Sequence, residues 1–110
     1  MPKSKLYLFK KTEVQLANLL KALSHPARIA ILSTLSKRTE CVCGEVVNVI
    51  PLAQATVSQH LKALKSAGLI SGEFEGPKSS YCLNWKNIEE LSSMLEDLVT
   101  TLKNNQQRCC

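Results

Sequence analysis

Two cysteines, Cys41 and Cys43, flank a single valine just ahead of a predicted short helix, and they offer the clearest chemistry in the chain. On a regular helix, residues i and i+2 point ~200° apart, so these thiols share one ion only where the backbone is not helical. Thiolates prefer soft, thiophilic centres to magnesium or calcium, and a helix N-terminus favours thiolate formation at Cys43. Tetrahedral divalent ions usually need about four ligands, whereas trivalent metalloids accept fewer thiolates. The pair therefore predicts a site for a trivalent metalloid such as arsenite or antimonite.

The other three cysteines have less defined roles. Cys109 and Cys110 end a polar tail, where they could supply a third thiolate in either subunit, form a separate vicinal-thiol site, or do neither. Cys82 stands between Tyr81 and Leu83 on a predicted strand and is interpreted as a packing residue. Five cysteines do not pair into a complete disulfide framework. Together with the lack of an apolar secretory block, this favours reduced thiols in the cytoplasm.

The composition indicates a single soluble domain with a modest basic excess. A chain of 110 residues has room for one core, and hydrophobic residues make up 45% of it. The net charge is +5, and no acidic residue occurs from Pro51 to Gly72. A basic, acid-free stretch suits nucleic acid. No apolar run reaches the ~18 residues of a membrane span.

Hydrophobic periodicity predicts a mainly α-helical domain, 1–110, with a small β-hairpin, in the order α-α-α-α-β-β-α. A basic arm, 1–11, precedes it, and a flexible Cys-ending tail, 104–110, follows. The expected helices span about 12–23, 26–36, 43–49 and 53–66, with a fifth from Asn84 to about 102. Thr12 and Gln15 fit a capping box, Ser24 or His25 can cap the second helix, and Gly68 suits a left-handed helix stop. The hairpin is expected from Leu69 to Leu83, with its loop at 75–79.

The 43–49 and 53–66 helices form a helix-turn-helix, and the hairpin after them is a wing. The second helix carries polar side chains in its first turns, where recognition helices usually meet base edges. The predicted base-reading residues are Gln54, Thr56, Ser58 and Gln59, and the predicted phosphate contacts are Lys62, Lys65 and Lys78. His60 is either a DNA contact or a packing residue. With no arginine on this helix, the strong Arg–guanine pair is missing, which favours A·T-leaning sites.

Leucine spacing predicts how two copies pair. The last helix has a seam that steps three and four residues, which is typical of coiled coils, but it is too short to be stable alone. We expect it to pair with its symmetry mate and with the first helix, through Leu16, Leu19, Leu20, Ile88, Leu91, Leu95, Leu98 and Leu102.

The chain resembles the ArsR/SmtB family of metal- and metalloid-responsive repressors over roughly residues 12–102. The resemblance rests on the segments 22–32, 53–61 (with its Thr-Val-Ser-Gln-His-Leu run) and 64–69, and on Glu-Cys-Val-Cys at 40–43, which is similar to the arsenic/antimony-sensing branch and to the cadmium/lead branch. It implies a homodimeric winged helix that binds a palindromic operator through successive major grooves and releases it when an inducer binds. Two departures are clear: Val46 stands where the metalloid branch often has a third cysteine, and residues 1–40 lack the N-terminal cysteines of the cadmium/lead branch.

The expected function is therefore a DNA-binding repressor that a trivalent metalloid, bound at Cys41 and Cys43, releases from its operator. The metalloid is an inducer, and no constitutive cofactor is expected. Three alternatives stay open: a redox or reactive-sulfur sensor on the same scaffold, a cadmium/lead sensor, and a winged helix that binds protein. An enzyme is not expected, because the sequence has no nucleophile–base constellation, phosphate loop or nucleotide fingerprint.

Overall fold

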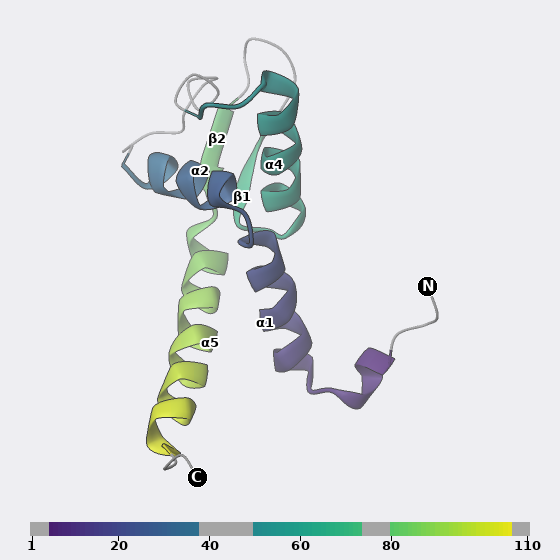
Figure 1. The fold of residues 1–110 in the computed structure, drawn as a ribbon, viewed down its shortest axis with the longest axis vertical. Coiled ribbons are helices and arrows are strands. Elements are labelled where there is room, and N and C mark those ends of the chain that lie inside the picture. Colours follow the sequence, from purple (N-terminus) through teal and green to yellow (C-terminus); the bar gives the residue numbers. More distant parts are fainter. Residues whose placement is uncertain (1–4, 38–49, 74–79, 107–110) are drawn as a thin grey trace.

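The computed structural model describes residues 5–37, 50–73 and 80–106 (Figure 1). Along this part of the chain the elements are η1 (Lys5–Leu8), α1 (Lys11–Ala22), α2 (Pro26–Ser36), α4 (Gln54–Ser66), β1 (Ile70–Glu73), β2 (Ser80–Leu83) and α5 (Trp85–Asn104). The predicted mainly helical architecture with one hairpin is confirmed for these residues. The helix expected at 43–49 and the loop expected at 75–79 lie outside them.

Helix boundaries follow local capping chemistry. At the start of α2, the His25 Nδ1 atom accepts a hydrogen bond from the Ala27 N–H at 3.0 Å, and Pro26 fills the first helical position, where its missing N–H costs nothing. Asn84 caps α5 by accepting from the Asn87 N–H at 3.4 Å. The predicted capping box at Thr12 was wrong: α1 begins one residue earlier, and a Glu13 carboxylate oxygen accepts from the Lys10 N–H at 3.0 Å.

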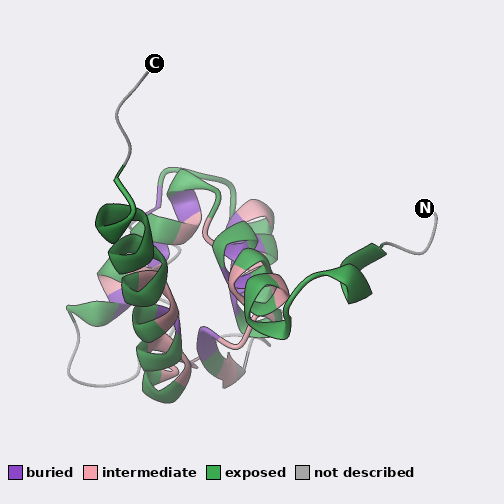
Figure 2. Cartoon of the chain, turned by 90° about the horizontal axis from the view of Figure 1, so that it is seen from below, coloured by how far each residue is buried: buried purple, intermediate pink, exposed green. Residues whose placement is uncertain are grey.

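The core lies where α2, α4 and the hairpin meet. Its most deeply buried side chains are Ile31, Val57, Leu61, Leu64, Leu69 and Ile70. On α4 the buried residues recur three and four positions apart, so one stripe faces the core and the opposite side remains exposed (Figure 2). The core therefore fixes which face of α4 is available to a ligand.

The hairpin is antiparallel, with Ile70 opposite Leu83 and Gly72 opposite Tyr81. Gly72 has a φ of +147°, and a Cβ added there would lie 1.9 Å from the backbone oxygen of Ser80. The two strands thus approach each other at a position that only glycine can occupy.

The end of α4 is joined to the beginning of α5. Gly68 has a φ of +82°, the left-handed stop predicted from the sequence. The Asn87 side-chain amide donates to the Gly68 carbonyl at 2.8 Å, and the Asn84 N–H donates to the Leu69 carbonyl at 3.0 Å. These bonds hold the base of the hairpin and α5 in one arrangement, from which α1 and α5 extend away from the core (Figure 1).

Candidate nucleic-acid interface

The outer face of α4 carries the predicted base-reading side chains. Gln54 and Gln59 are exposed, and Thr56 and Ser58 are half-buried at the edges of the face. Lys62 is also exposed, two turns beyond Ala55, and α4 contains no acidic residue. An exposed, polar and acid-free helix face matches what major-groove readout requires.

His60 lies on the other side of α4, turned towards α2. Only 8% of its surface is exposed, its Nδ1 atom accepts from the Arg28 Nε–H at 3.1 Å, and its ring centroid lies 4.3 Å from that of His25. Of the two roles left open by the sequence, this burial favours packing and counts against a DNA contact.

The electrostatics around His60 keep its imidazole neutral. Burial lowers its pKa below the usual 6.5, and the nearby charges of His25 and Arg28 lower it further. Because Nδ1 accepts a hydrogen bond, the proton must be on Nε2, and that buried N–H has no hydrogen-bond partner within the described part of the protein. This contact between α2 and α4 is therefore stable only while the ring is uncharged.

Sequence reasoning missed Arg28 as part of this arrangement. The Arg28 guanidinium also donates to the Ala22 carbonyl at 3.3 Å, so Arg28 links the end of α1, the first turn of α2 and α4. Arg28 and His60 are separated by 32 positions, and no local sequence pattern predicts a contact between them.

The predicted phosphate contacts differ in their surroundings. The Lys65 ammonium donates to the Gly72 carbonyl at 2.6 Å, which ties the end of α4 to the hairpin. Lys62 and Lys65 are both exposed, and the bond to the hairpin uses one of the three N–H donors of the Lys65 ammonium. Lys78 lies outside the described residues.

The predicted metalloid ligands Cys41, Cys43, Cys109 and Cys110 lie outside the described residues. Cys82 is half-buried on β2 and is disulfide-bonded, so the prediction of free thiols was wrong for this residue. Elsewhere in the described ranges, no group of three or more His, Cys, Asp or Glu side chains could hold a metal ion.

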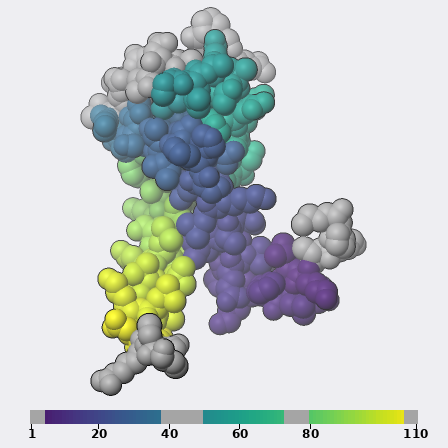
Figure 3. Space-filling view, in the orientation of Figure 1, coloured from purple at the N-terminus to yellow at the C-terminus, as the bar shows by residue number. Residues whose placement is uncertain are grey.

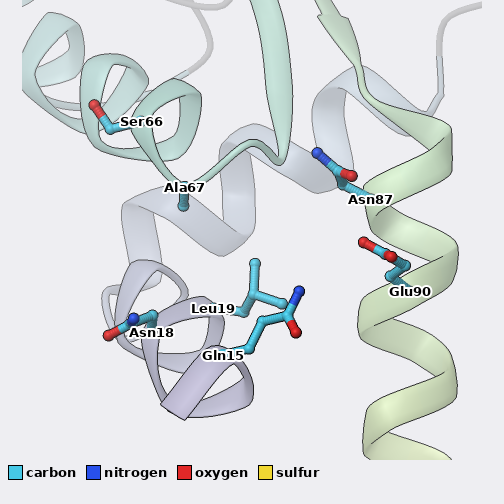
Figure 4. Close-up of a pocket in the computed structure, with 7 residues that line it drawn as sticks. All are labelled: Gln15, Asn18, Leu19, Ser66, Ala67, Asn87 and Glu90. Atoms are coloured by element: carbon cyan, nitrogen blue, oxygen red, sulfur yellow. The ribbon is translucent and has the colours of Figure 1, made fainter. Parts of the chain in front are cut away.

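A polar crevice lies where α1, the end of α4 and α5 converge (Figure 4). It is lined by Gln15, Asn18, Leu19, Ser66, Ala67, Asn87 and Glu90. The Asn87 amide that donates to Gly68 forms part of this wall, so the crevice belongs to the junction that positions α4 relative to α5.

Comparison with known proteins identifies the family. The model "Bacterial regulatory protein, arsR family" matches residues 25–71, from the His25 cap through β1. An arsenical resistance operon repressor of Bacillus subtilis is 32% identical over 113 residues, which cover all of both chains. This chain belongs to the ArsR family of bacterial regulatory proteins.

Further relatives include one named without an inducer and one named for cadmium resistance. The transcriptional repressor SmtB of Mycobacterium tuberculosis is 46% identical over 65 residues, 59% of this chain, but the match spans only 47% of SmtB. A cadmium resistance regulatory protein CadC homolog of Staphylococcus aureus is 36% identical over 81% of this chain and 74% of its own length.

Among solved structures, a homodimeric winged helix-turn-helix DNA-binding domain from Mycobacterium bovis has a TM-score of 0.62 at 22% identity, covering 99% of this chain and 98% of its own. The predicted winged helix-turn-helix fold is thus confirmed. No helix among the described residues is both long and apolar enough to cross a membrane.

Proposed function

We propose that this protein is a homodimeric transcriptional repressor that binds a palindromic operator and releases it when arsenite or antimonite binds Cys41 and Cys43. The observation that carries DNA binding is the exposed, acid-free face of α4, held by an inner face of Val57, Leu61, Leu64 and the buried His60. Relatives named as arsenical resistance repressors support the metalloid as inducer. The cytoplasm is its proposed compartment.

In the proposed complex, α4 enters the major groove. Gln59 can form paired hydrogen bonds with adenine, and Ser58 can bond to a base or a phosphate. Lys62 neutralises a phosphate, and Lys65, whose ammonium carries three N–H donors, can do the same without giving up its bond to the Gly72 carbonyl. Lys78 is proposed as a further phosphate contact from the wing.

Release is proposed to begin at the two thiolates. A metalloid that binds both draws them to one centre, which the i and i+2 positions of a helix do not allow. The predicted 43–49 helix would therefore unwind at its start and shift α4 in both half-sites. A change of only ~1.4 kcal/mol weakens operator binding tenfold, so a small displacement is enough.

The test is arsenite titration of the reduced protein on fluorescent DNA from upstream of its own gene, followed by anisotropy. Cys43→Ser should bind DNA normally and no longer release it. Because Cys82 is itself disulfide-bonded, Cys82→Ser is made alongside Cys43→Ser to show whether the thiol on β2 takes part in the response. Retained arsenite response in the Cys43→Ser protein would refute the assigned ligand, and the same test with Cys109→Ser and Cys110→Ser decides whether the tail supplies a third thiolate.

A thiol redox sensor is a second candidate, favoured by the disulfide at Cys82. In this case two thiols lose two electrons and two protons to an oxidant and form a disulfide. Diamide, rather than arsenite, would then release DNA, and dithiothreitol would restore binding. Cadmium or lead is the third candidate inducer, and cadmium is the metal named for the CadC homolog. The same anisotropy assay measures whether either ion releases the DNA.

A further inference from the structure

The segment before α1 carries consecutive apolar side chains that are largely exposed on their own subunit. Leu6, Tyr7, Leu8 and Phe9 are consecutive and all exposed, with 82% of Tyr7 and 59% of Phe9 accessible, and η1 has no buried residue. Large exposed apolar patches on a small domain usually mark a contact surface. We call residues 5–10 the N-terminal arm.

The arm stands away from the body of its own subunit. Figures 1 and 3 show it extending from the start of α1, on the side of α1 opposite to α5, and the rotated view in Figure 2 agrees. The arm therefore does not cover α5 of its own chain, although α1 packs beside that helix.

The surface of α5 has the complementary character. A groove along it is lined mainly by apolar side chains, including Leu95 and Val99, and towards the end of the helix Val99 and Leu102 are 43% and 64% exposed. Glu96 lines the same groove. An apolar surface with an acidic border suits an apolar segment with basic flanks.

The charges follow this pattern. The arm and the first residue of α1 carry Lys5, Lys10 and Lys11, all exposed, whereas α5 carries four acidic residues, Glu89, Glu90, Glu96 and Asp97, against two lysines. Oppositely charged surfaces favour association and fix the orientation of the partners.

We propose that, in the homodimer, the N-terminal arm of each subunit packs on α5 of its partner. The inference rests on the homodimer of the proposed function. If α1 and α5 of two subunits pair around a twofold axis, each α1 lies between its own α5 and that of the partner. An arm on the far side of α1 then reaches the partner's α5, and the exchange occurs twice by symmetry. DNA or an anionic membrane could attract the lysines, but neither would use the acidic α5 surface.

Sedimentation equilibrium of the full chain tests this contact. The Tyr7→Ser/Phe9→Ser double variant should raise the dimer dissociation constant roughly ten- to hundredfold, since buried aromatic anchors dominate such interfaces. Ile29→Ser, at an equally exposed apolar residue on α2, is the matched control and should leave the constant unchanged. Circular dichroism confirms that all variants are folded.

The outcomes separate the two proposals. A wild-type chain that stays monomeric would overturn the homodimer together with the arm contact. A dimeric wild type whose arm variant dissociates no more readily than Ile29→Ser would overturn the arm contact alone.

A photo-crosslink identifies the occupant directly. Tyr7→p-benzoylphenylalanine is made in unlabelled and in ¹⁵N-labelled chains, which are mixed and allowed to exchange before irradiation. Crosslinks between the arm and residues 85–104 that join a labelled to an unlabelled peptide are expected. Crosslinks only within one isotope, or only to other elements, would overturn the proposal.

Discussion

Replacing His60 by leucine separates the packing of α4 on α2 from the charge of the imidazole. At pH 8, the variant loses the hydrogen bond from Arg28, worth about 1 kcal/mol because the half-exposed guanidinium can turn to water. It also removes the buried Nε2–H, whose missing partner costs ~1–3 kcal/mol. His60→Leu should therefore unfold with a free energy equal to that of the wild type or up to ~2 kcal/mol higher.

The difference should grow as the pH falls. Burial lowers the pKa of His60 in the folded protein, so below about pH 6.5 the unfolded chain binds a proton that the folded chain resists. The neutral His60 ring makes its full contribution to the unfolding free energy of the wild type above pH 6.5. This contribution is lost as the pH falls through the folded-state pKa of His60. His60→Leu lacks this dependence.

Urea unfolding followed by circular dichroism at pH 8.0, 7.0, 6.0 and 5.5 measures this difference, with equal m-values as the check on two-state behaviour. The stability advantage of His60→Leu should be larger at pH 5.5 than at pH 8.0. Parallel pH profiles for the two proteins would refute the assignment of a buried, neutral imidazole at this position.

Further predictions concern the hairpin, the DNA-facing surface and the core. Gly72→Ala should lower the unfolding free energy by at least ~1–3 kcal/mol, because the added Cβ would meet the facing strand. Thermal melting measures the loss, with Ser71→Ala at the exposed neighbouring position as the control. Equal melting temperatures for the two variants would contradict the hairpin register. Lys62→Gln should reduce the slope of log DNA-binding constant against log salt concentration by ~0.9 without changing stability. Lys103→Gln, at the far end of α5, is the control and should leave the slope unchanged. Equal slopes for Lys62→Gln and the wild type would remove Lys62 from the interface. Leu61→Ala, which truncates a fully buried side chain, should cost ~2–5 kcal/mol in urea unfolding, and a loss below ~1 kcal/mol would place α4 differently.

The sequence predicted those features whose causes are local. Pro26 with a capping residue before it, the left-handed Gly68 and the leucine spacing of α4 each depend on a few neighbouring residues. The structure confirms all three. Helix boundaries were less certain: Thr12 is a common cap, but the Glu13 carboxylate reaches the Lys10 N–H and starts α1 earlier.

The site was predictable only on its outer face. Periodicity was enough to place the polar residues of α4 on its outer face, because they lie opposite the core stripe. The inward contacts of His60 with Arg28, and of Lys65 with the Gly72 carbonyl, depend on how α2 and the hairpin pack on α4. A polar residue at the edge of an apolar stripe gives the same sequence pattern whether its side chain faces the core or the solvent. The sequence alone therefore did not decide whether His60 packs inside the protein or contacts DNA.

Metalloid control requires that a thiol-binding inducer weaken DNA binding by this winged helix. The most direct measurement is the dissociation constant of the reduced wild-type protein for its upstream DNA, with and without saturating arsenite, at constant salt and pH. With metalloid control, arsenite should increase the dissociation constant at least about tenfold, equivalent to ~1.4 kcal/mol of coupling. Equal constants, at a DNA affinity that falls steeply with salt, would leave a DNA-binding winged helix and contradict metalloid control.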